Sequence, residues 1–186
     1  TQELASLIKK EKINLDQLSD EEFDSPLGIS SGGGTIFGAE GGVAGSALRT
    51  IVELITKKPL EKIEFEELRK IKGLKTATIP VNNKEIKVAI TNGIQHAKIL
   101  LDEIRENKSP YHFIEVMACQ GGCIGGSGQP DSTPEIRLKR SQALYKIDRG
   151  KEVRISYKNP VVKQLYQEFL EKPLSKKAHL LLHVER

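Results

Sequence analysis

Cys119 and Cys123 are the two cysteines of the chain, and they stand four positions apart. Two thiolates at this spacing can bind one metal centre if the backbone between them turns sharply. Gly121 and Gly122 permit such a turn, because glycine adopts positive φ angles at little cost. Glycines also let backbone N–H groups approach sulfur closely, which stabilises thiolates and raises the reduction potential of a bound cluster. The segment is therefore a candidate source of two ligands for an iron–sulfur site.

The residues alone leave other interpretations of the two cysteines open. Free cysteines are among the most buried residue types, so both could be structural thiols beside a flexible loop, although the density of glycines argues against this. Structural zinc needs about four protein ligands. His179 and His183 share a predicted helix face, but no sequence feature brings them to the cysteines. For both histidines, a core or surface role is favoured over metal ligation.

A second glycine-rich run, residues 32–42, precedes a predicted helix and resembles a phosphate-binding loop only in part. It lacks the GK[ST] ending of a P-loop, and no strand precedes it as a dinucleotide fingerprint requires. We therefore favour a segment in which the backbone closely approaches a bulky group. Phe37 lies between glycines, as expected of a side chain placed against a ligand.

Composition restricts the partners and the location of the protein. The net charge of +4 comes from interspersed basic and acidic residues, which indicates solvated faces and argues against a nucleic-acid partner. No run of about 18 apolar residues predicts a membrane span, and no signal peptide is visible. Two closely spaced cysteines suit a disulfide framework poorly. We therefore expect a reducing, cytoplasmic environment.

The elements that must position these residues follow from hydrophobic periodicity. Pro26 and Gly28 break the chain after the first helix, and the strand before Cys119 would place the cysteine turn at a strand's carboxyl end, a usual location for ligands. One domain, residues 1–186, with an α/β fold and a small mixed sheet flanked by helices is expected. The sequence predicts a first short helix that ends near Lys9-Lys10 and a second turn from Asp16. Further helices are predicted over 43–58, 93–104, 134–148 and 160–170, with a final helical turn over 177–184, and the predicted strands are 74–81, 85–90 and 113–118.

Residues 113–130, including the Cys119 motif and its Gly-Gln-Pro ending, closely resemble the third cluster-binding motif of iron-only (FeFe) hydrogenases. The resemblance extends over nearly the whole chain, in the family's order. It is carried by Asp24-Ser25-Pro26-Leu27-Gly28, Gly38-Ala39-Glu40-Gly41-Gly42-Val43, Asn92-Gly93, Ala143-Leu144-Tyr145, Asn159-Pro160 and Leu165-Tyr166.

The resemblance implies a cofactor and separate roles for five residues. The family's H-cluster joins a 4Fe–4S cubane to a two-iron subsite and is held by four cysteines. By resemblance, Cys119 is a terminal cubane ligand and Cys123 bridges the cubane to the two-iron subsite. Met117 would pack beside that subsite, and Phe37 and Gly38 would line the same pocket.

This chain departs from the family pattern at several positions. Ala44-Gly45 stands where the family usually has a methionine–glutamate pair, Gln120 often is proline, and Ser127 interrupts a glycine triplet. The first two cluster-binding motifs, which carry the other cubane cysteines, a relay cysteine and a lysine, are expected upstream of Thr1.

Taken together, the resemblance implies the C-terminal lobe of a hydrogenase catalytic domain. Its expected partners are the N-terminal lobe of the same domain, ferredoxin or another electron-transfer protein, and hydrogenase maturation proteins. Alone, the lobe is expected to be inactive and to hold no cluster. The alternative is a non-enzymatic relative that acts in iron–sulfur assembly or sensing.

Overall fold

A four-stranded mixed sheet forms the centre of the fold. The computed structural model describes residues 1–24, 28–60, 66–67 and 73–184, so the predicted break at Pro26 lies outside the described residues. The sheet order is β1 (Glu66–Glu67), β2 (Leu74–Val81), β3 (Lys84–Asn92) and β4 (Phe113–Met117). Successive strands pair antiparallel up to β3, whereas β3 and β4 are parallel. The α/β prediction is confirmed, while the two-residue β1 is too short for its sequence to predict.

The connections within the sheet follow from local sequence. β2 and β3 form the predicted hairpin, with Val81 opposite Lys84. Asn82, in the turn between them, has a φ of 54°, a left-handed conformation that asparagine tolerates better than most residues. Gly93 then begins α4 (Ile94–Arg105). This helix carries the chain back along the sheet, which lets β4 lie parallel to β3.

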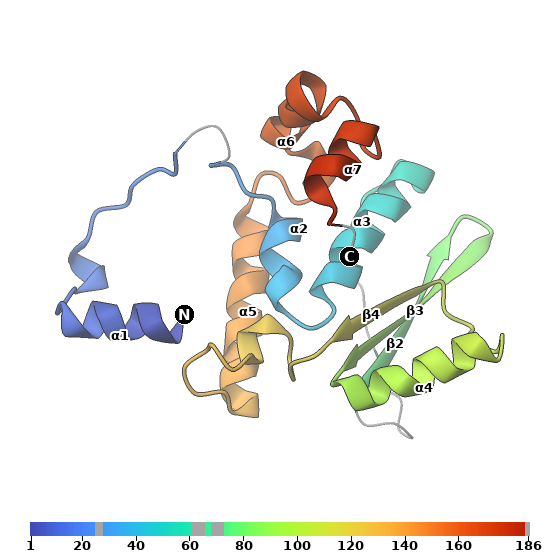
Figure 1. The fold of residues 1–186 in the computed structure, drawn as a ribbon, viewed down its shortest axis with the longest axis horizontal. Helices are drawn as coiled ribbons and strands as arrows, with labels where there is room; N and C mark the ends of the chain where they lie inside the picture. The colour runs from blue at the N-terminus through green and yellow to red at the C-terminus, as the bar shows by residue number, and fades with distance from the viewer. Residues whose placement is uncertain (25–27, 61–65, 68–72, 185–186) are drawn as a thin grey trace.

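Helices α3 (Gly42–Thr56) and α4 cover opposite faces of the sheet, as Figure 1 shows. Successive strand residues face opposite sides, so Val88 packs in the cluster beneath α3 and Ala89 in the cluster beneath α4. The first cluster consists of Ala44, Leu48, Val52, Ile79, Val81 and Val88. The second consists of Leu74, Ala89 and Leu100. These two layers hold β4, and therefore the residues that follow it, in a fixed direction.

The remaining helices lie beside this three-layer unit. The second glycine run forms α2 (Gly32–Thr35) and a 3-10 turn (Ile36–Gly38) rather than an irregular loop. α5 (Pro134–Gly150) packs against α2. Helix α1 (Gln2–Lys10) buries none of its residues, and a 3-10 turn (Leu15–Gln17) follows it.

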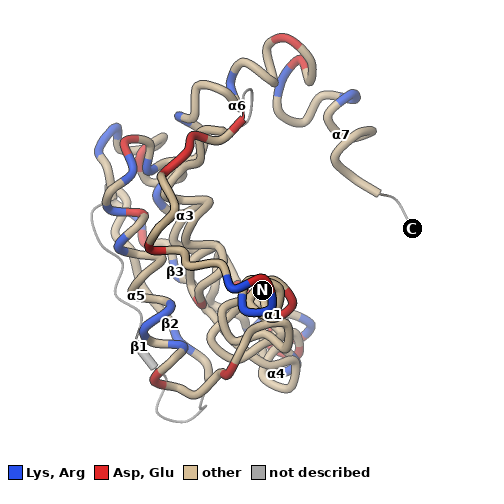
Figure 2. The backbone as a smooth tube through the Cα atoms, turned by 90° about the vertical axis from the view of Figure 1, so that its left-hand side faces the viewer, with Lys and Arg blue, Asp and Glu red and all other residues tan. Residues whose placement is uncertain are grey.

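The helix predicted over 160–170 is divided into α6 (Pro160–Leu165) and a π-helical segment (Tyr166–Leu170). α7 (Lys176–Leu182) follows. These three elements form what we call the C-terminal arm, which curves away from the body of the molecule in Figure 2. The same view shows basic and acidic residues interspersed along the chain. Among the described residues, no helix is long and apolar enough to cross a membrane.

Glu115, in the middle of β4, fixes the start of α3 to the sheet. Its side chain is buried, with 5% of the residue exposed. Its two carboxylate oxygens accept hydrogen bonds from the N–H groups of Gly41 (2.8 Å) and Ala44 (2.7 Å). Burial raises the pKa of Glu115 above its ordinary value, although these N–H groups oppose the shift. The carboxylate thus supplies acceptors that the first turn of a helix otherwise lacks, from a strand more than 70 residues away.

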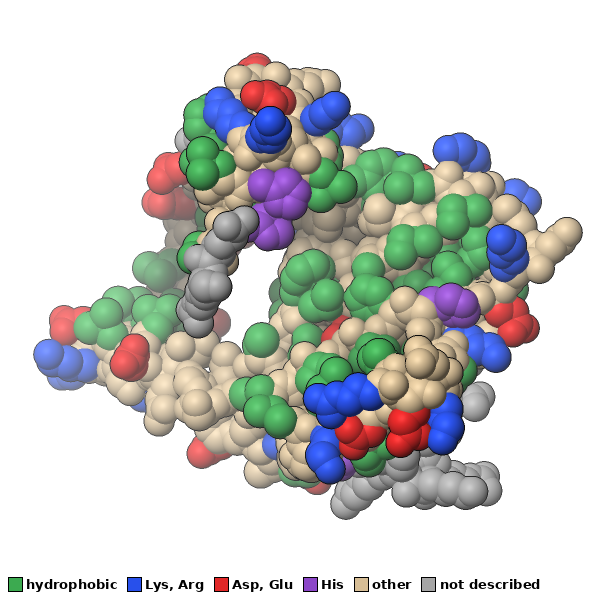
Figure 3. Space-filling model, turned by 45° about the vertical axis from the view of Figure 1, so that its right-hand side comes forward, with side chains coloured by type: hydrophobic (Ala, Val, Ile, Leu, Met, Phe, Trp, Pro, Cys, Tyr) green, Lys and Arg blue, Asp and Glu red, His purple; other side chains and the backbone are tan. Residues whose placement is uncertain are grey.

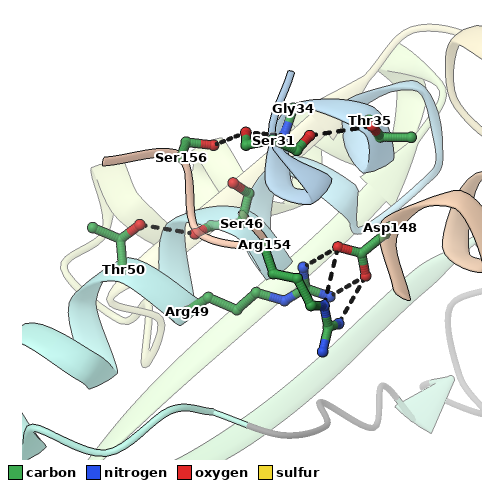
Figure 4. A network of polar contacts seen from close by, with 9 residues as sticks. All are labelled: Ser31, Gly34, Thr35, Ser46, Arg49, Thr50, Asp148, Arg154 and Ser156. Atoms are coloured by element: carbon green, nitrogen blue, oxygen red, sulfur yellow. Dashed lines mark hydrogen bonds and ion pairs between the residues drawn. The ribbon is translucent and has the colours of Figure 1, made fainter. Parts of the chain in front are cut away.

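Asp148 joins α5 to α3 in the interior, as Figure 4 shows. It is fully buried and accepts a two-pronged hydrogen bond from Arg49, at 2.7 and 2.9 Å, and another from Arg154 at 2.8 Å. Burial alone would raise the pKa of Asp148, but the two guanidinium groups outweigh this and hold it below its ordinary value. α2 passes so close that a Cβ on Gly32 would lie 2.1 Å from the Asp148 Oδ1 atom.

Asp148→Asn should lower the free energy of unfolding by about 3 kcal/mol near neutral pH, because two guanidinium groups lose their carboxylate. Since the folded pKa is depressed, the carboxylate stabilises the wild type above the ordinary Asp pKa of about 4, and this stabilisation is lost as the pH falls further. Urea unfolding at several pH values measures both effects. Asp102→Asn, on the surface of α4, should cost less than about 1 kcal/mol. If both variants lose the same free energy of unfolding, the ion pairs of Asp148 do not stabilise the interior as described.

Glu115→Ala should lower the free energy of unfolding by about 1–3 kcal/mol, because the N–H groups of Gly41 and Ala44 lose their acceptors. Urea unfolding near neutral pH measures the loss. Glu85→Ala, at an exposed position of β3, is the matched control and should stay within about 0.5 kcal/mol of the wild type. If Glu115→Ala is as stable as this control, the Glu115 carboxylate does not stabilise the start of α3.

Candidate metal centre

The cysteine segment forms a tight turn directly after β4. Gly121 and Gly122 have φ angles of 77° and 87°, so the predicted use of positive φ is present. The N–H of Gly122 donates to the Cys119 carbonyl (3.1 Å), and a 3-10 turn then begins at Cys123. Both cysteines are free and exposed. This exposure contradicts the interpretation of two buried structural thiols.

The second glycine run lies against this turn, backbone to backbone. The N–H of Glu40 donates to the Gly121 carbonyl at 3.1 Å. A Cβ on Gly122 would lie 2.8 Å from both the Gly38 carbonyl oxygen and the Met117 Sδ atom. The structure therefore brings Gly38 and Met117 to the cysteine segment, as expected. The second glycine run was predicted to approach a bulky group closely. In the structure, its backbone closely approaches the cysteine turn.

Phe37 and Cys119 lie at the surface of this assembly. Phe37 shares the 3-10 turn with Gly38, and 47% of the residue is exposed. The loop after Cys123 passes close to the other thiol, because a Cβ on Gly126 would lie 3.6 Å from the Cys119 Sγ atom. The aromatic ring and both thiols are thus available to a group outside the described residues.

Two arginines of α5 hold the far side of the cysteine turn. Arg140 donates to the carbonyls of Ile124 (2.9 Å) and Pro130 (2.5 Å). Arg137 donates to the Ser132 carbonyl, and its Cδ atom would lie 2.8 Å from a Cβ on Gly121. Both guanidinium groups bring positive charge to a segment with two thiols. No sequence motif pointed to these arginines, although their three-residue spacing on a predicted helix puts them on one face.

A carboxylate of the second glycine run lies beside the turn. Glu40 forms an ion pair with Lys75 of β2, with its Oε2 atom 3.0 Å from the Lys75 Nζ atom. Its Oε1 atom is buried and has no hydrogen-bond partner within the described part of the chain. No sequence signal pairs Glu40 with Lys75, because the two residues stand 35 positions apart and only the fold brings them together.

The donor set of the described residues is incomplete for a metal. Within residues 1–24, 28–60, 66–67 and 73–184, no group of three or more His, Cys, Asp or Glu side chains could hold a metal ion. A closed zinc site, which needs about four protein ligands, is therefore not formed by these residues. What they offer is a glycine-lined turn with two exposed thiols.

Comparison with known proteins agrees with this geometry. The family described as "Iron only hydrogenase large subunit, C-terminal domain" matches residues 1–127, and "Iron hydrogenase small subunit" matches residues 134–185. The NADP-reducing hydrogenase subunit HndD of Solidesulfovibrio fructosivorans is 46% identical over 98% of this chain and 32% of its own length. The chain therefore spans about a third of that relative.

Solved structures extend the agreement to three dimensions. The FeFe-hydrogenase HydA1 of Chlamydomonas reinhardtii matches with a TM-score of 0.78 and 36% identity, over 98% of this chain and 53% of that one. A more distant relative, the cytosolic Fe-S cluster assembly factor narfl of Danio rerio, is 28% identical over 98% of this chain and 46% of its own length. On the family match and the identity to HndD, the chain belongs to the iron-only hydrogenase family.

Proposed function

We propose that residues 1–186 act as one domain, the C-terminal lobe of a hydrogenase catalytic domain, and supply two cysteine ligands to its H-cluster. One observation carries the proposal: the turn after β4 presents Cys119 and Cys123 together, both exposed and unpaired. The 46% identity to a hydrogenase subunit supports the same assignment. The complete domain would interconvert protons, electrons and H₂.

The donor chemistry and the shape of the turn fit this cofactor. Cys119 would be a terminal ligand of the cubane, and Cys123 would bridge the cubane to the two-iron subsite. Phe37, Gly38 and Met117 would line the pocket around that subsite. When bound, the cluster supplies the redox chemistry, and the protein supplies thiolates, an apolar wall and hydrogen bonds.

The chain's own residues hold the cysteine turn in place. Arg137 and Arg140 donate to backbone carbonyls of the turn and of the loop that follows it. Glu115 and the backbone of Glu40 fix the second glycine run against the turn. Such rigidity keeps both sulfur atoms at a set separation before a cluster is inserted.

The proposal requires partners, since the described residues hold half of a four-cysteine set. The N-terminal lobe of the same domain would supply the other two cysteines, and maturation proteins would insert the two-iron subsite. Ferredoxin or a related protein would exchange electrons with the complete enzyme. Alone, the lobe would be inactive and would retain little iron.

A second candidate function is non-enzymatic iron–sulfur assembly or sensing on the same fold. The relative narfl, described as a cluster assembly factor, covers 98% of this chain. Ala44 and Gly45, both buried at the start of α3, replace the family's methionine–glutamate pair and remove side chains near Glu115. The 28% identity to narfl against 46% to HndD keeps this candidate second.

Cys123→Ala should abolish H₂ evolution when the lobe is expressed together with an N-terminal hydrogenase lobe and the maturation machinery. The reason is that the two-iron subsite would lose its protein ligand. Gas chromatography measures H₂, and anaerobic iron analysis of the purified complex measures cluster loading. Lys98→Ala, on the exposed side of α4, is the control and should evolve H₂ as the wild type does.

Three outcomes separate the candidates. H₂ evolution that persists in Cys123→Ala would rule out the bridging role. A wild-type complex that binds iron through both cysteines but evolves no H₂ would favour the assembly or sensing function. A complex that binds no iron in any form would exclude both.

Gly122→Ala should lower the free energy of unfolding by about 1–3 kcal/mol, because it strains a positive φ and drives a methyl group into Gly38 and Met117. Iron loading of the two-lobe complex should fall as well. Gly128→Ala is a matched control in the same loop, since a Cβ there meets nothing within 4 Å. Urea unfolding and iron analysis compare the two variants, and indistinguishable results would refute the steric role of Gly122.

A further inference from the structure

The C-terminal arm carries two histidine rings in contact with each other. His179 lies in the last turn of α7, and His183 directly follows the helix. Their ring centroids are 4.7 Å apart and their planes are inclined by 39°. Both residues are exposed, and Figure 3 shows the histidines of the arm at the molecular surface. The core role considered from the sequence is therefore excluded for both.

We propose that His179 and His183 bind one divalent transition-metal cation, such as Zn²⁺, at a site separate from the cysteine turn. Two histidines four positions apart on a helix can reach a single metal ion, as in the HExxH pattern. Metal–nitrogen bonds of about 2 Å put the centroids of two imidazoles on one tetrahedral metal roughly 5 Å apart. The observed centroid separation of 4.7 Å is close to this value.

The local backbone keeps the two histidines at helical spacing. The N–H of His183 donates to the His179 carbonyl at 3.0 Å, which continues the helical spacing past the end of α7. At the other end, the buried Ser175 hydroxyl accepts from the Ala178 N–H (3.0 Å) and donates to the Leu170 carbonyl (2.7 Å). The helix is therefore anchored to the rest of the arm, and a metal need not order a mobile segment.

The surrounding charges allow a cation at this end of the helix. The last carbonyls of a helix carry partial negative charge that favours cations. The neighbouring Lys177 places its ammonium group 4.1 Å from the ring centroid of Phe169, so this charge has an aromatic partner of its own. The carbonyls at this end of the helix therefore favour a cation, rather than an anion, beside the two imidazoles.

The coordination number implies an exchangeable site. No third His, Cys, Asp or Glu joins the pair among the residues that the structure describes. The remaining positions on the metal would be filled by water or by a ligand of another molecule. Imidazole suits Zn²⁺, Ni²⁺ and Cu²⁺, and binding should be reversible rather than structural, because structural zinc takes about four protein ligands.

Zinc titration by isothermal calorimetry tests the proposal in the full chain carrying Cys119→Ser and Cys123→Ser, which removes competing thiols. One Zn²⁺ per chain is expected in this background. His179→Ala and His183→Ala should each weaken binding by about 100-fold, because the second ligand then no longer acts intramolecularly. His112→Ala removes a histidine whose Nδ1 atom accepts the Lys87 N–H, and it should leave zinc binding unchanged.

A second measurement covers any loss of fold in these variants. Circular dichroism establishes that each variant is folded, and line broadening of histidine side-chain resonances by Ni²⁺ reports which rings bind. Selective broadening of His179 and His183 supports the site. Zinc affinity that is unchanged in both single variants, or broadening spread equally over the four histidines, would overturn it.

Discussion

The buried carboxylate of Glu115 is the contact on which the geometry of the candidate metal centre depends. A carboxylate inside a protein is costly unless its oxygens are hydrogen-bonded. Here two backbone N–H groups at the start of α3 meet that need, and the same two bonds tie the helix to β4. β4 then runs directly into Cys119. The strand that positions the thiols and the helix that follows the second glycine run are thus locked by a single side chain.

A steric constraint also fixes the cysteine turn against the second glycine run. Gly122 and the Gly38–Glu40 backbone approach so closely that a Cβ on Gly122 would lie 2.8 Å from the Gly38 carbonyl oxygen and 2.9 Å from the Glu40 nitrogen. Glycine at these points costs chain entropy, and the sequence accepts that cost in two separate runs. A contact between two backbones holds position more rigidly than a contact between flexible side chains. That rigidity is what a site needs if its ligands must be in place before a cluster arrives.

Periodicity and turn chemistry predict most of the elements, because those signals are local. The β2–β3 hairpin, the helix after Gly93 and the strand before Cys119 follow from alternation and from glycine and asparagine positions. The sequence could not reveal the partners of Glu115, or the pairing of Asp148 with Arg49, because these partners lie 71 to 99 positions away on other elements. It could not show that the histidine rings of α7 meet each other, since a shared helix face does not fix rotamers. The metal roles of the two cysteines rest on resemblance and remain proposals.

The two family matches meet inside the candidate site, and this has a physical consequence. The cysteine turn belongs to the part that matches the large subunit, whereas Arg137 and Arg140 belong to the part that matches the small subunit. The second part therefore holds the loop that carries the two cysteines, in addition to packing on its surface. The Asp148–Arg49 pair crosses the same boundary and is buried. Weakening the Asp148–Arg49 pair should therefore loosen α5. Arg137 and Arg140 on α5 would then hold the cysteine loop less firmly.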